Sequence, residues 1–572
     1  MRRLFPLFLL AAMAGCTPSE STANGGPKTP ANTDVGQTDP KKTDTKTDGK
    51  TPDGKTDPTA DKGTSPKPST DKPAYRDEQG LAELTQDLVA LPLAAAPKGL
   101  PEAPKTCQAF VKRKPKPAAA CAEPDKALEA LDKALAETKA DKRDELLLGL
   151  ESCAGLPAGV TRALRAEFAP AECADVIVES LVNAPPKGMD GTVYATLRGL
   201  ATAARLARTG ANPPKLAAPF EVKRVKEFTA GPMKDWMVEQ AQAIQELSNE
   251  STKLNFYARG VAAIEAGMAE LRVVEVVRAV PLPDSLAKEP EARNIYYAEL
   301  DQLLDPRKDR GRDAALVGLR DLAAVGVLKD ARVERARSLL SRLYGGRRID
   351  ALDALVLPAL PKLDAKTTIE RLASKLPTFY AGLLLGRDDV KKVEILRALL
   401  ERGVPVRHRL ALKGGEMSPE TRRLFARGRL ELGRVYLRAV DFDQSAALLD
   451  GLSATAKTPE DNMLAALVSA LRNGPEDAAV MVRSAPVPML GMGDIAALDA
   501  IAKTKDHPMA GFAAFDAALI KQITAPIGAD AAFFRDVAAR FRQAASLLSD
   551  AGLKKTAEER AKAAEAVATA IR

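Results

Sequence analysis

The spacing of apolar residues constrains the fold of this chain more than any other feature. From about residue 75 to the C-terminus they recur at positions i, i+3, i+4 and i+7, and Pro or Gly separates one such segment from the next. No region shows several short alternating strands joined by hairpin signals. Because only 4% of the residues are aromatic while 45% are hydrophobic, alanine and leucine must fill the core. The sequence therefore predicts an all-α fold of stacked helical hairpins, in the manner of an α-solenoid.

Three segments give specific predictions within this pattern. A helix is expected to begin near Pro124, where leucines recur on one face. The valine-rich segment 273–280 is expected to be helical and not a strand, because its apolar positions lack a two-residue alternation. Residues 330–344 are expected to form a further helix, with Asp330 as its N-cap.

The first 16 residues have the features of an export signal. A basic start at residues 1–3 precedes a short apolar segment at 4–12, and Met-Ala-Gly-Cys follows at 13–16. The apolar segment is too short to cross a bilayer, which needs about 20 residues. Small residues directly before Cys16 resemble the lipobox of bacterial lipoproteins, although Met13 stands where that family usually has Leu.

This resemblance implies that residues 1–15 are a signal peptide and that Cys16 is acylated and becomes the first residue. Thr17 stands where the family's inner-membrane retention signal has Asp, so the resemblance also implies the bacterial outer membrane, facing the periplasm or the cell surface. Several acyl chains would hold the protein firmly, since each buried methylene contributes ~0.8 kcal/mol. The alternative is an ordinary secretory signal that happens to contain a cysteine.

Residues 16–74 are expected to be a disordered linker behind the lipidated cysteine. Between Thr17 and Ala74 the only larger aliphatic residue is Val35, no aromatic occurs, and nine Lys balance eight Asp and one Glu. Such a segment cannot bury enough apolar surface to offset the entropy lost on ordering. Such a linker would let the folded body act away from its membrane, for example across the cell wall or on the cell surface. The alternative is that it is a plain spacer.

The folded body is expected to comprise three helical regions, 75–215, 216–390 and 391–572. All cysteines beyond Cys16 lie in the first region, at Cys107, Cys121, Cys153 and Cys173. They lack C-x-x-C spacing and histidine partners, so disulfides are favoured over zinc or thioredoxin-like chemistry in an exported protein. Three pairings are possible, and proximity in the sequence favours Cys107–Cys121 with Cys153–Cys173.

Residues 420–483 contain the clearest internal pattern, formed by Leu432, Gly433, Tyr436, Asp441, Phe442, Asp443 and Ser445. Their spacing resembles that of tetratricopeptide repeats, and a shift of 34 residues gives a weaker copy at Met463, Ala466, Leu467, Ala470, Gly474 and Ala479. The resemblance implies two helices that approach at Gly433, with Tyr436 filling the gap and Asp441 beginning the turn. Arg429, Leu452 and Pro459 depart from the family pattern. The alternative is a generic pair of helical hairpins.

The few matches to catalytic, metal-binding or cofactor-binding motifs lack the partner residues or the flanking structure that such sites need. Only two histidines occur, His408 and His507, which nearly rules out a multi-histidine metal site and limits Ser-His-Asp or Cys-His catalysis. Residues 491–496 match G-x-G-x-x-A, but a proline precedes them where a buried strand is needed, so no cofactor is expected. A hydrolase of cell-wall or other glycans needs only two carboxylates and is the alternative, although a single Trp offers little for stacking sugars.

Ten arginines lie in residues 307–348 and ten more in 397–438. Interleaved acids can pair with them, which favours solvated helix faces, and nucleic acid is not expected as a partner. The functional interpretation is a basic surface for an acidic protein segment or a cell-wall polymer. We therefore expect a non-enzymatic envelope scaffold that binds a protein or peptide near Arg422, Arg429 and Tyr436. The alternatives are the envelope hydrolase and a purely structural tether.

Overall fold

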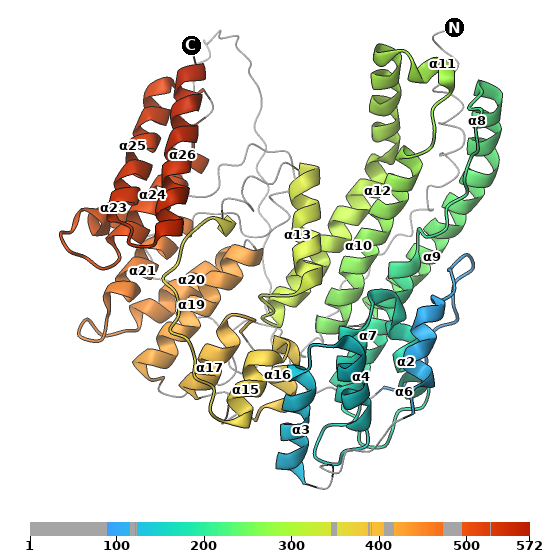
Figure 1. Cartoon of the computed structure of the whole chain (residues 1–572), viewed down its shortest axis with the longest axis horizontal. Coiled ribbons are helices and arrows are strands. Elements are labelled where there is room, and N and C mark those ends of the chain that lie inside the picture. The colour runs from blue at the N-terminus through green and yellow to red at the C-terminus, as the bar shows by residue number, and fades with distance from the viewer. Residues whose placement is uncertain are drawn as a thin grey trace, which may run out of the picture. The chain divides into compact units, whose positions relative to one another are not determined.

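The computed structural model describes residues 89–571, apart from 115–120, 122, 255, 345–351, 387–388, 390–391, 405–416, 437, 473–494 and 527. The expected signal peptide, Cys16 and the linker lie outside these residues, as do His408 and most of the segment 491–496. Within the described ranges the chain is helical and forms no strand, and its β contact is an isolated antiparallel bridge between Val327 and Gly403. The all-α prediction is therefore confirmed (Figure 1).

The helices follow one another closely along the chain. The first part holds η2 (Lys105–Cys107), α2 (Gln108–Lys112), α3 (Pro124–Ala136), α4 (Ala140–Gly149), α5 (Val160–Phe168), η4 (Ala171–Cys173), α6 (Ala174–Asn183) and α7 (Gly191–Arg208). The middle part holds α8 (Val222–Phe228), the π-helical turn η5 (Thr229–Met233), α9 (Lys234–Thr252), α10 (Phe256–Arg278), α11 (Asp284–Ala287), α12 (Pro290–Ala324) and α13 (Ala331–Tyr344). The last part holds α15 (Thr368–Lys375), α16 (Thr378–Leu384), α17 (Val393–Leu400), α19 (Pro419–Tyr436), α20 (Ala439–Asp450), α21 (Pro459–Leu471), α23 (Ala496–Lys503), α24 (Ala510–Ile523), α25 (Ala531–Leu547) and α26 (Ala551–Ala570).

The specific helix predictions are confirmed where the structure describes them. Helix α3 begins at Pro124, and the valine-rich segment belongs to α10 as far as Arg278. Helix α13 follows Asp330, whose carboxylate accepts a hydrogen bond from the Arg332 backbone N–H at 2.8 Å. This bond satisfies one of the N–H groups that a helix leaves unpaired at its start, which is why the helix begins there.

The long helices α10 and α12 lie side by side, and glycines set their separation (Figure 1). A Cβ atom on Gly267 would stand 2.5 Å from the Gly311 carbonyl oxygen, and one on Gly318 would stand 2.5 Å from Ile264 Cγ1. No side chain fits at such distances, so the two backbones can approach only where glycine lies on both helices. The pairs 260/318 and 267/311 share one antiparallel register, with the two contacts seven positions apart along each helix.

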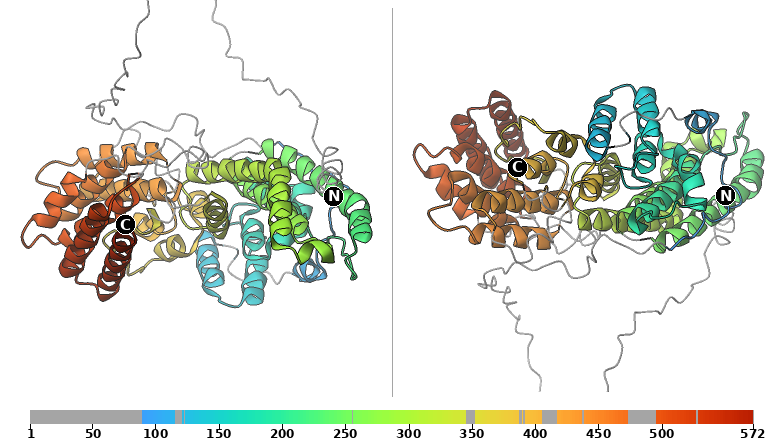
Figure 2. Two further views of the ribbon diagram at one scale, coloured as in Figure 1. Left: turned by 90° about the horizontal axis from the view of Figure 1, so that it is seen from above. Right: turned by 90° about the horizontal axis from the view of Figure 1, so that it is seen from below.

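The apolar core crosses the boundaries of the three expected regions. One cluster takes buried residues from α3 through α7, from α10 and α12, and from the helices that follow up to α26, while a second cluster joins α8, α9, α10 and α12. Helices α3 and α15, more than 230 residues apart, pack together, and Asp132 accepts hydrogen bonds there from Arg371 Nε at 2.8 Å and Lys375 Nζ at 2.5 Å. In Figure 2 the cyan helices of the first part accordingly lie beside the yellow ones. The boundaries at 215 and 390 stay predictions.

Helices α19 and α20 form the hairpin expected from the tetratricopeptide-like pattern, with one difference. A Cβ atom on Gly433 would stand 2.5 Å from Phe442 Cε1, so this glycine does let the helices approach. Asp441, however, lies in the first turn of α20 and is fully buried, whereas the pattern placed it at the beginning of the turn. Much of the weaker second copy, including Gly474 and Ala479, lies outside the described residues.

Candidate functional site

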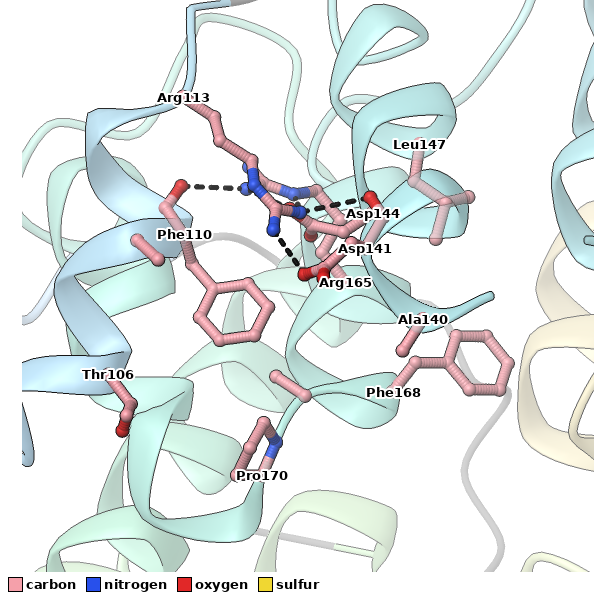
Figure 3. A pocket seen from close by; sticks show the side chains of 12 residues that line it. Thr106, Phe110, Arg113, Ala140, Asp141, Asp144, Leu147, Arg165, Phe168 and Pro170 are labelled. Carbon is pink, nitrogen blue, oxygen red and sulfur yellow. Dashed lines mark hydrogen bonds and ion pairs between the residues drawn. The ribbon is translucent and has the colours of Figure 1, made fainter. Parts of the chain in front are cut away.

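Two neighbouring pockets are the candidate functional site. The first, which we call the aromatic pocket, has a volume of about 390 Å³. The rings of Phe110 and Phe168 line it, and charged side chains gather at one end (Figure 3). Its full lining is Thr106, Ala109, Phe110, Arg113, Ala140, Asp141, Asp144, Leu147, Arg165, Phe168, Ala169 and Pro170. All these residues lie within 65 positions of one another, on α2, α4, the end of α5 and the short segments beside them.

Two disulfides fix the elements around the aromatic pocket. Cys107 directly precedes α2 and bonds to Cys173 directly before α6, with Cα atoms 5.1 Å apart. Cys121 bonds to Cys153, with Cα atoms 4.3 Å apart. The prediction of disulfides is confirmed, but the predicted partners are wrong. Helix packing decides which cysteines meet, whereas the entropy advantage of shorter loops grows only logarithmically and is too weak to select them.

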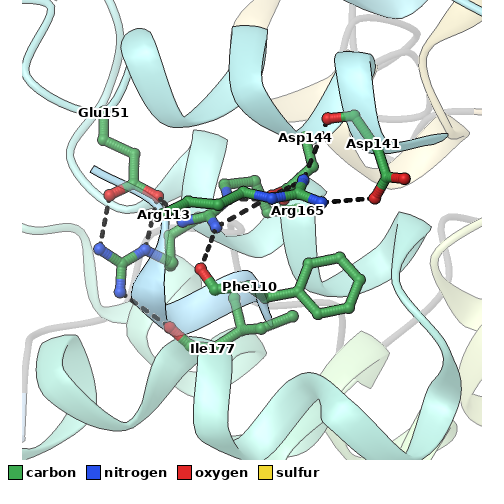
Figure 4. A network of polar contacts seen from close by, with 8 residues as sticks. Phe110, Arg113, Asp141, Asp144, Glu151, Arg165 and Ile177 are labelled. Carbon is green, nitrogen blue, oxygen red and sulfur yellow. Dashed lines mark hydrogen bonds and ion pairs between the residues drawn. The ribbon is translucent and has the colours of Figure 1, made fainter. Parts of the chain in front are cut away.

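Charged side chains of the aromatic pocket's lining belong to a network of polar contacts, which Figure 4 shows. Arg165, which is 3% exposed, donates to Asp144 Oδ1 at 2.8 Å, to Glu151 Oε1 at 2.7 Å and to the Phe110 carbonyl oxygen at 3.0 Å. Arg113 donates to Asp144 Oδ2 at 2.7 Å and also pairs with Asp141. Burial opposes the charge of Arg165, but Asp144 and Glu151 outweigh this cost and raise the pKa of the guanidinium. The network therefore holds α2, α4 and α5 together, and with Arg162, which pairs with Glu151, its three arginines balance its three carboxylates.

The second pocket, which we call the arginine pocket, has a volume of about 450 Å³ and shares Phe168 and Ala169 with the first. Its charged lining comprises Glu167, Glu265, Lys329, Asp330, Arg332, Arg335 and Arg402, which are four cations and three carboxylates. Arg332 and Arg335 come from the first arginine-rich stretch and Arg402 comes from the second. The fold thus brings the two stretches together at one site, which the sequence alone did not indicate.

A buried polar cluster holds the helices around the arginine pocket. Glu167 on α5 accepts hydrogen bonds from Tyr257 Oη on α10 at 2.6 Å, from Tyr380 Oη on α16 at 3.0 Å and from Arg332 Nη2 on α13 at 2.6 Å. Burial raises the pKa of both tyrosines well above the usual value, so they stay protonated and donate. Burial opposes the charge of Arg332, but Asp330 and Glu167 outweigh it and raise its pKa. One carboxylate therefore joins four helices that are distant in the sequence.

The structure places two of the three expected partner contacts inside the protein. Arg429 is 1% exposed and donates to Asp441 Oδ1 at 2.7 Å. Tyr436 is 3% exposed and donates to the Val327 carbonyl oxygen at 2.7 Å. Arg422 is half-buried, with its guanidinium against Gly451. Arg429 and Tyr436 are core residues here, and a partner cannot reach them without local opening.

The expectation that the arginine-rich stretches form solvated faces is wrong for several of their members. Arg307 and Arg337 are 6% and 5% exposed, and they donate to Glu270 and Asp353 at 2.7 and 2.6 Å. An arginine can be buried when its guanidinium meets a carboxylate with good geometry, which a count of charges along the sequence does not reveal.

A hydrolase using a carboxylate pair would need two such groups close together, with a raised pKa for the general acid and an ionised partner. Among the described residues, Asp516 is the carboxyl whose pKa is raised, to about 8, and burial is the main cause. It accepts a hydrogen bond from the backbone N–H of Val356 at 2.8 Å, so it anchors a loop. The described part of the chain also holds no group of three His, Cys, Asp or Glu side chains placed to bind a metal, and none of its helices has the length and apolarity of a membrane span.

His507 lies in a turn before α24, where its Nδ1 atom accepts a hydrogen bond from the Met509 backbone N–H at 3.2 Å. This contact gives it a local structural role. No protein-family model matches the sequence, and no curated protein and no solved structure is significantly similar to it.

Proposed function

We propose that this protein is a lipid-anchored scaffold of the bacterial envelope that binds a segment of a partner protein without converting it chemically. The observation that supports the proposal is the pair of adjoining pockets with the common wall of Phe168 and Ala169. Each has the volume of a typical binding site, and the first combines apolar and aromatic walls with a few fixed polar groups. Such a surface recognises a side chain by shape and desolvation.

The walls of both pockets are held before any partner arrives. Two disulfides and the Arg165 network fix the aromatic pocket, and the Glu167 cluster fixes the arginine pocket. A preorganised site loses less conformational entropy on binding than one that must order its own side chains. This favours recognition of a flexible segment, because the scaffold contributes the rigid half of the complex.

The proposed membrane localisation is a separate part of the proposal and rests on the lipobox-like residues before Cys16. It is tested by mass spectrometry of the mature N-terminus, which should carry acyl chains on Cys16, and by fractionation of a Cys16→Ser variant. We expect the variant to leave the membrane fraction. A mature protein without fatty acid would refute the anchor but would leave the binding site untouched.

The binding function is tested by site-specific photo-crosslinking of the full chain in intact cells. Ala109 is exposed on α2 and lines the aromatic pocket, so a photoreactive amino acid at this position should capture one defined partner. Position 566 on α26 is an exposed alanine outside both pockets and serves as the matched control. Capture of the same proteins from both positions, or of none from position 109, would contradict the proposal.

A further inference from the structure

The shared wall between the pockets allows one ligand to occupy both. Phe168 ends α5, and the guanidinium of Arg143 lies 4.5 Å from the centre of its ring. The next residues, Ala169 to Ala171, continue along the border, with Pro170 lining the first pocket and Ala171 the second. An extended peptide advances about 3.3–3.6 Å per residue, so a short segment is long enough to cross such a wall.

The two pockets differ in how far their charges are balanced. In the aromatic pocket Arg113 and Arg165 both pair with carboxylates of the same network. A further charge entering it would be desolvated with no unpaired partner, so this pocket selects an apolar group.

In the arginine pocket the three carboxylates are already engaged. Glu167 and Asp330 both pair with Arg332, at 2.6 and 2.8 Å. Glu265, which is 2% exposed, lies between Arg335 and Arg272. Each acid of the lining therefore lies beside a cation, with Glu167 and Asp330 sharing Arg332, and the repulsion that it would exert on an incoming carboxylate is reduced.

Two cations of the arginine pocket, Lys329 and Arg402, lie outside the ion pairs that the described residues form there. In the described part of the chain Lys329 and Arg402 form no ion pair within 4.0 Å. Lys329 is exposed, whereas Arg402 is half-buried and donates to the Lys375 carbonyl oxygen. Burial lowers the pKa of Arg402, although the charge of the adjacent Glu401 acts in the opposite direction. An anionic group placed between these cations would gain two charge-assisted contacts.

We infer that the two pockets together recognise a short partner segment in which an apolar side chain lies close to a carboxylate. The apolar side chain enters the aromatic pocket, and the carboxylate of an Asp or Glu enters the arginine pocket beside Lys329 and Arg402. This inference rests on the proposed binding function and adds the chemistry of the partner.

The inference is tested with the full chain and fluorescein-labelled Gly-Ser peptides, measured by fluorescence anisotropy. Each peptide carries one Leu and one Glu separated by zero to three residues, and matched peptides carry Ala for Leu or Gln for Glu. We expect the best Leu/Glu peptide to bind at least about ten times more tightly than either matched peptide, because each pocket contributes its own share of the binding free energy.

Two protein variants assign the effect to the two pockets. Lys329→Glu should weaken the Leu/Glu peptide about tenfold while changing the Leu/Gln peptide little, and Lys562→Glu on α26 makes the same charge change away from the pockets. Ala109→Trp should fill the aromatic pocket and weaken every peptide that carries Leu, with Ala566→Trp as its control. Lys329, Lys562, Ala109 and Ala566 are all exposed, so these variants should fold.

Equal affinity for the Glu and Gln peptides would overturn the inference. So would binding of inorganic phosphate at Lys329 that displaces no peptide, because the pocket would then be a site for small anions. Failure of the peptide series is distinguishable from failure of the proposed function. If cells still give a partner crosslinked at position 109 and not at 566, the scaffold stands and only the chemistry assigned to its partner is wrong.

Discussion

The two pockets share a wall but are built in different ways. The aromatic pocket uses residues 106–170, which are near one another in the sequence, and disulfides hold the surrounding elements. The arginine pocket gathers residues from 166 to 402, and a buried carboxylate with its three donors holds them. A local pocket can depend on covalent crosslinks, whereas a pocket assembled from remote helices depends on the packing of the whole body. The comparison predicts that different changes will damage each pocket.

The largest effect is expected from removing the Cys107–Cys173 disulfide by a Cys107→Ala/Cys173→Ala double variant. The bond closes a 66-residue loop, and its loss should lower the free energy of unfolding by about 4 kcal/mol on the chain-entropy model. Urea unfolding measures this loss. Hydrogen exchange should show greater loss of protection in α2 and α4 than in α13.

Reductant breaks both disulfides of the wild-type protein, so the reduced wild type should lose more stability than the untreated double variant. It should match the double variant in reductant, where the added loss comes only from Cys121–Cys153. A loss of protection spread evenly over both pockets would contradict the comparison. It would mean that the disulfide stabilises the body as one unit and not the aromatic pocket in particular.

The next effect concerns the arginine pocket. Glu167→Gln removes the charge that pairs with Arg332 and leaves a buried amide among Tyr257 and Tyr380. Removing one partner of a buried ion pair is expected to cost about 3 kcal/mol, although Asp330 still pairs with Arg332. Urea unfolding measures the loss, and hydrogen exchange should now show it in α13 and α16.

Glu559→Gln is the matched control, because Glu559 forms an exposed pair with Lys555 on α26. It should change stability by less than about 0.5 kcal/mol. If Glu167→Gln proves as mild as this control, the carboxylate does not hold the four helices together.

The same difference explains what the sequence could and could not predict. The helical fold, the start of α3, the N-cap at Asp330 and the close approach at Gly433 depend on local spacing, which a sequence displays directly. The disulfide partners and the burial of Arg429 depend on which helices pack together, which the sequence does not display.

One signal for long-range packing was nevertheless present. Glycines seven residues apart occur in both long helices, at 260 and 267 and again at 311 and 318, and all four lie where the backbones of α10 and α12 come close. Repeated small residues at helical spacing can predict such a pair. Nothing comparable marks the arginine pocket, because its residues lie on separate helices with no shared period.

Measuring stability as a function of pH tests a buried carboxyl that lies outside both pockets. Asp516 lies in neither lining, and burial raises its pKa to about 8, above the value of about 3.9 expected in the unfolded chain. Between these values the folded state binds a proton that the unfolded state lacks, so stability falls as pH rises and levels off above pH 8. Between pH 6 and pH 8 the loss should be about 2 kcal/mol.

Asp516→Asn cannot ionise and can still accept the hydrogen bond from the Val356 N–H. Its stability should therefore lack this pH dependence, as urea unfolding at pH 6, 7 and 8 will show. Peptide binding at the pockets should be unchanged in the variant at pH 6. If wild type and variant show the same pH slope, the carboxyl is not protonated in the folded protein.

The smallest effect is expected at the charged end of the aromatic pocket, for Arg113→Met. This side chain is 19% exposed, it pairs with Asp141 and Asp144, and its guanidinium lies 5.4 Å from the Phe110 ring centre. Asp144 keeps Arg165 as a partner in the variant, so no buried carboxylate is left unpaired. The loss of stability should be about 1 kcal/mol, against less than about 0.5 kcal/mol for the exposed pair removed by Arg542→Met. A loss near that of Glu167→Gln would show that the two pockets depend equally on their ion pairs, and the contrast between crosslinked and packed walls would then fail.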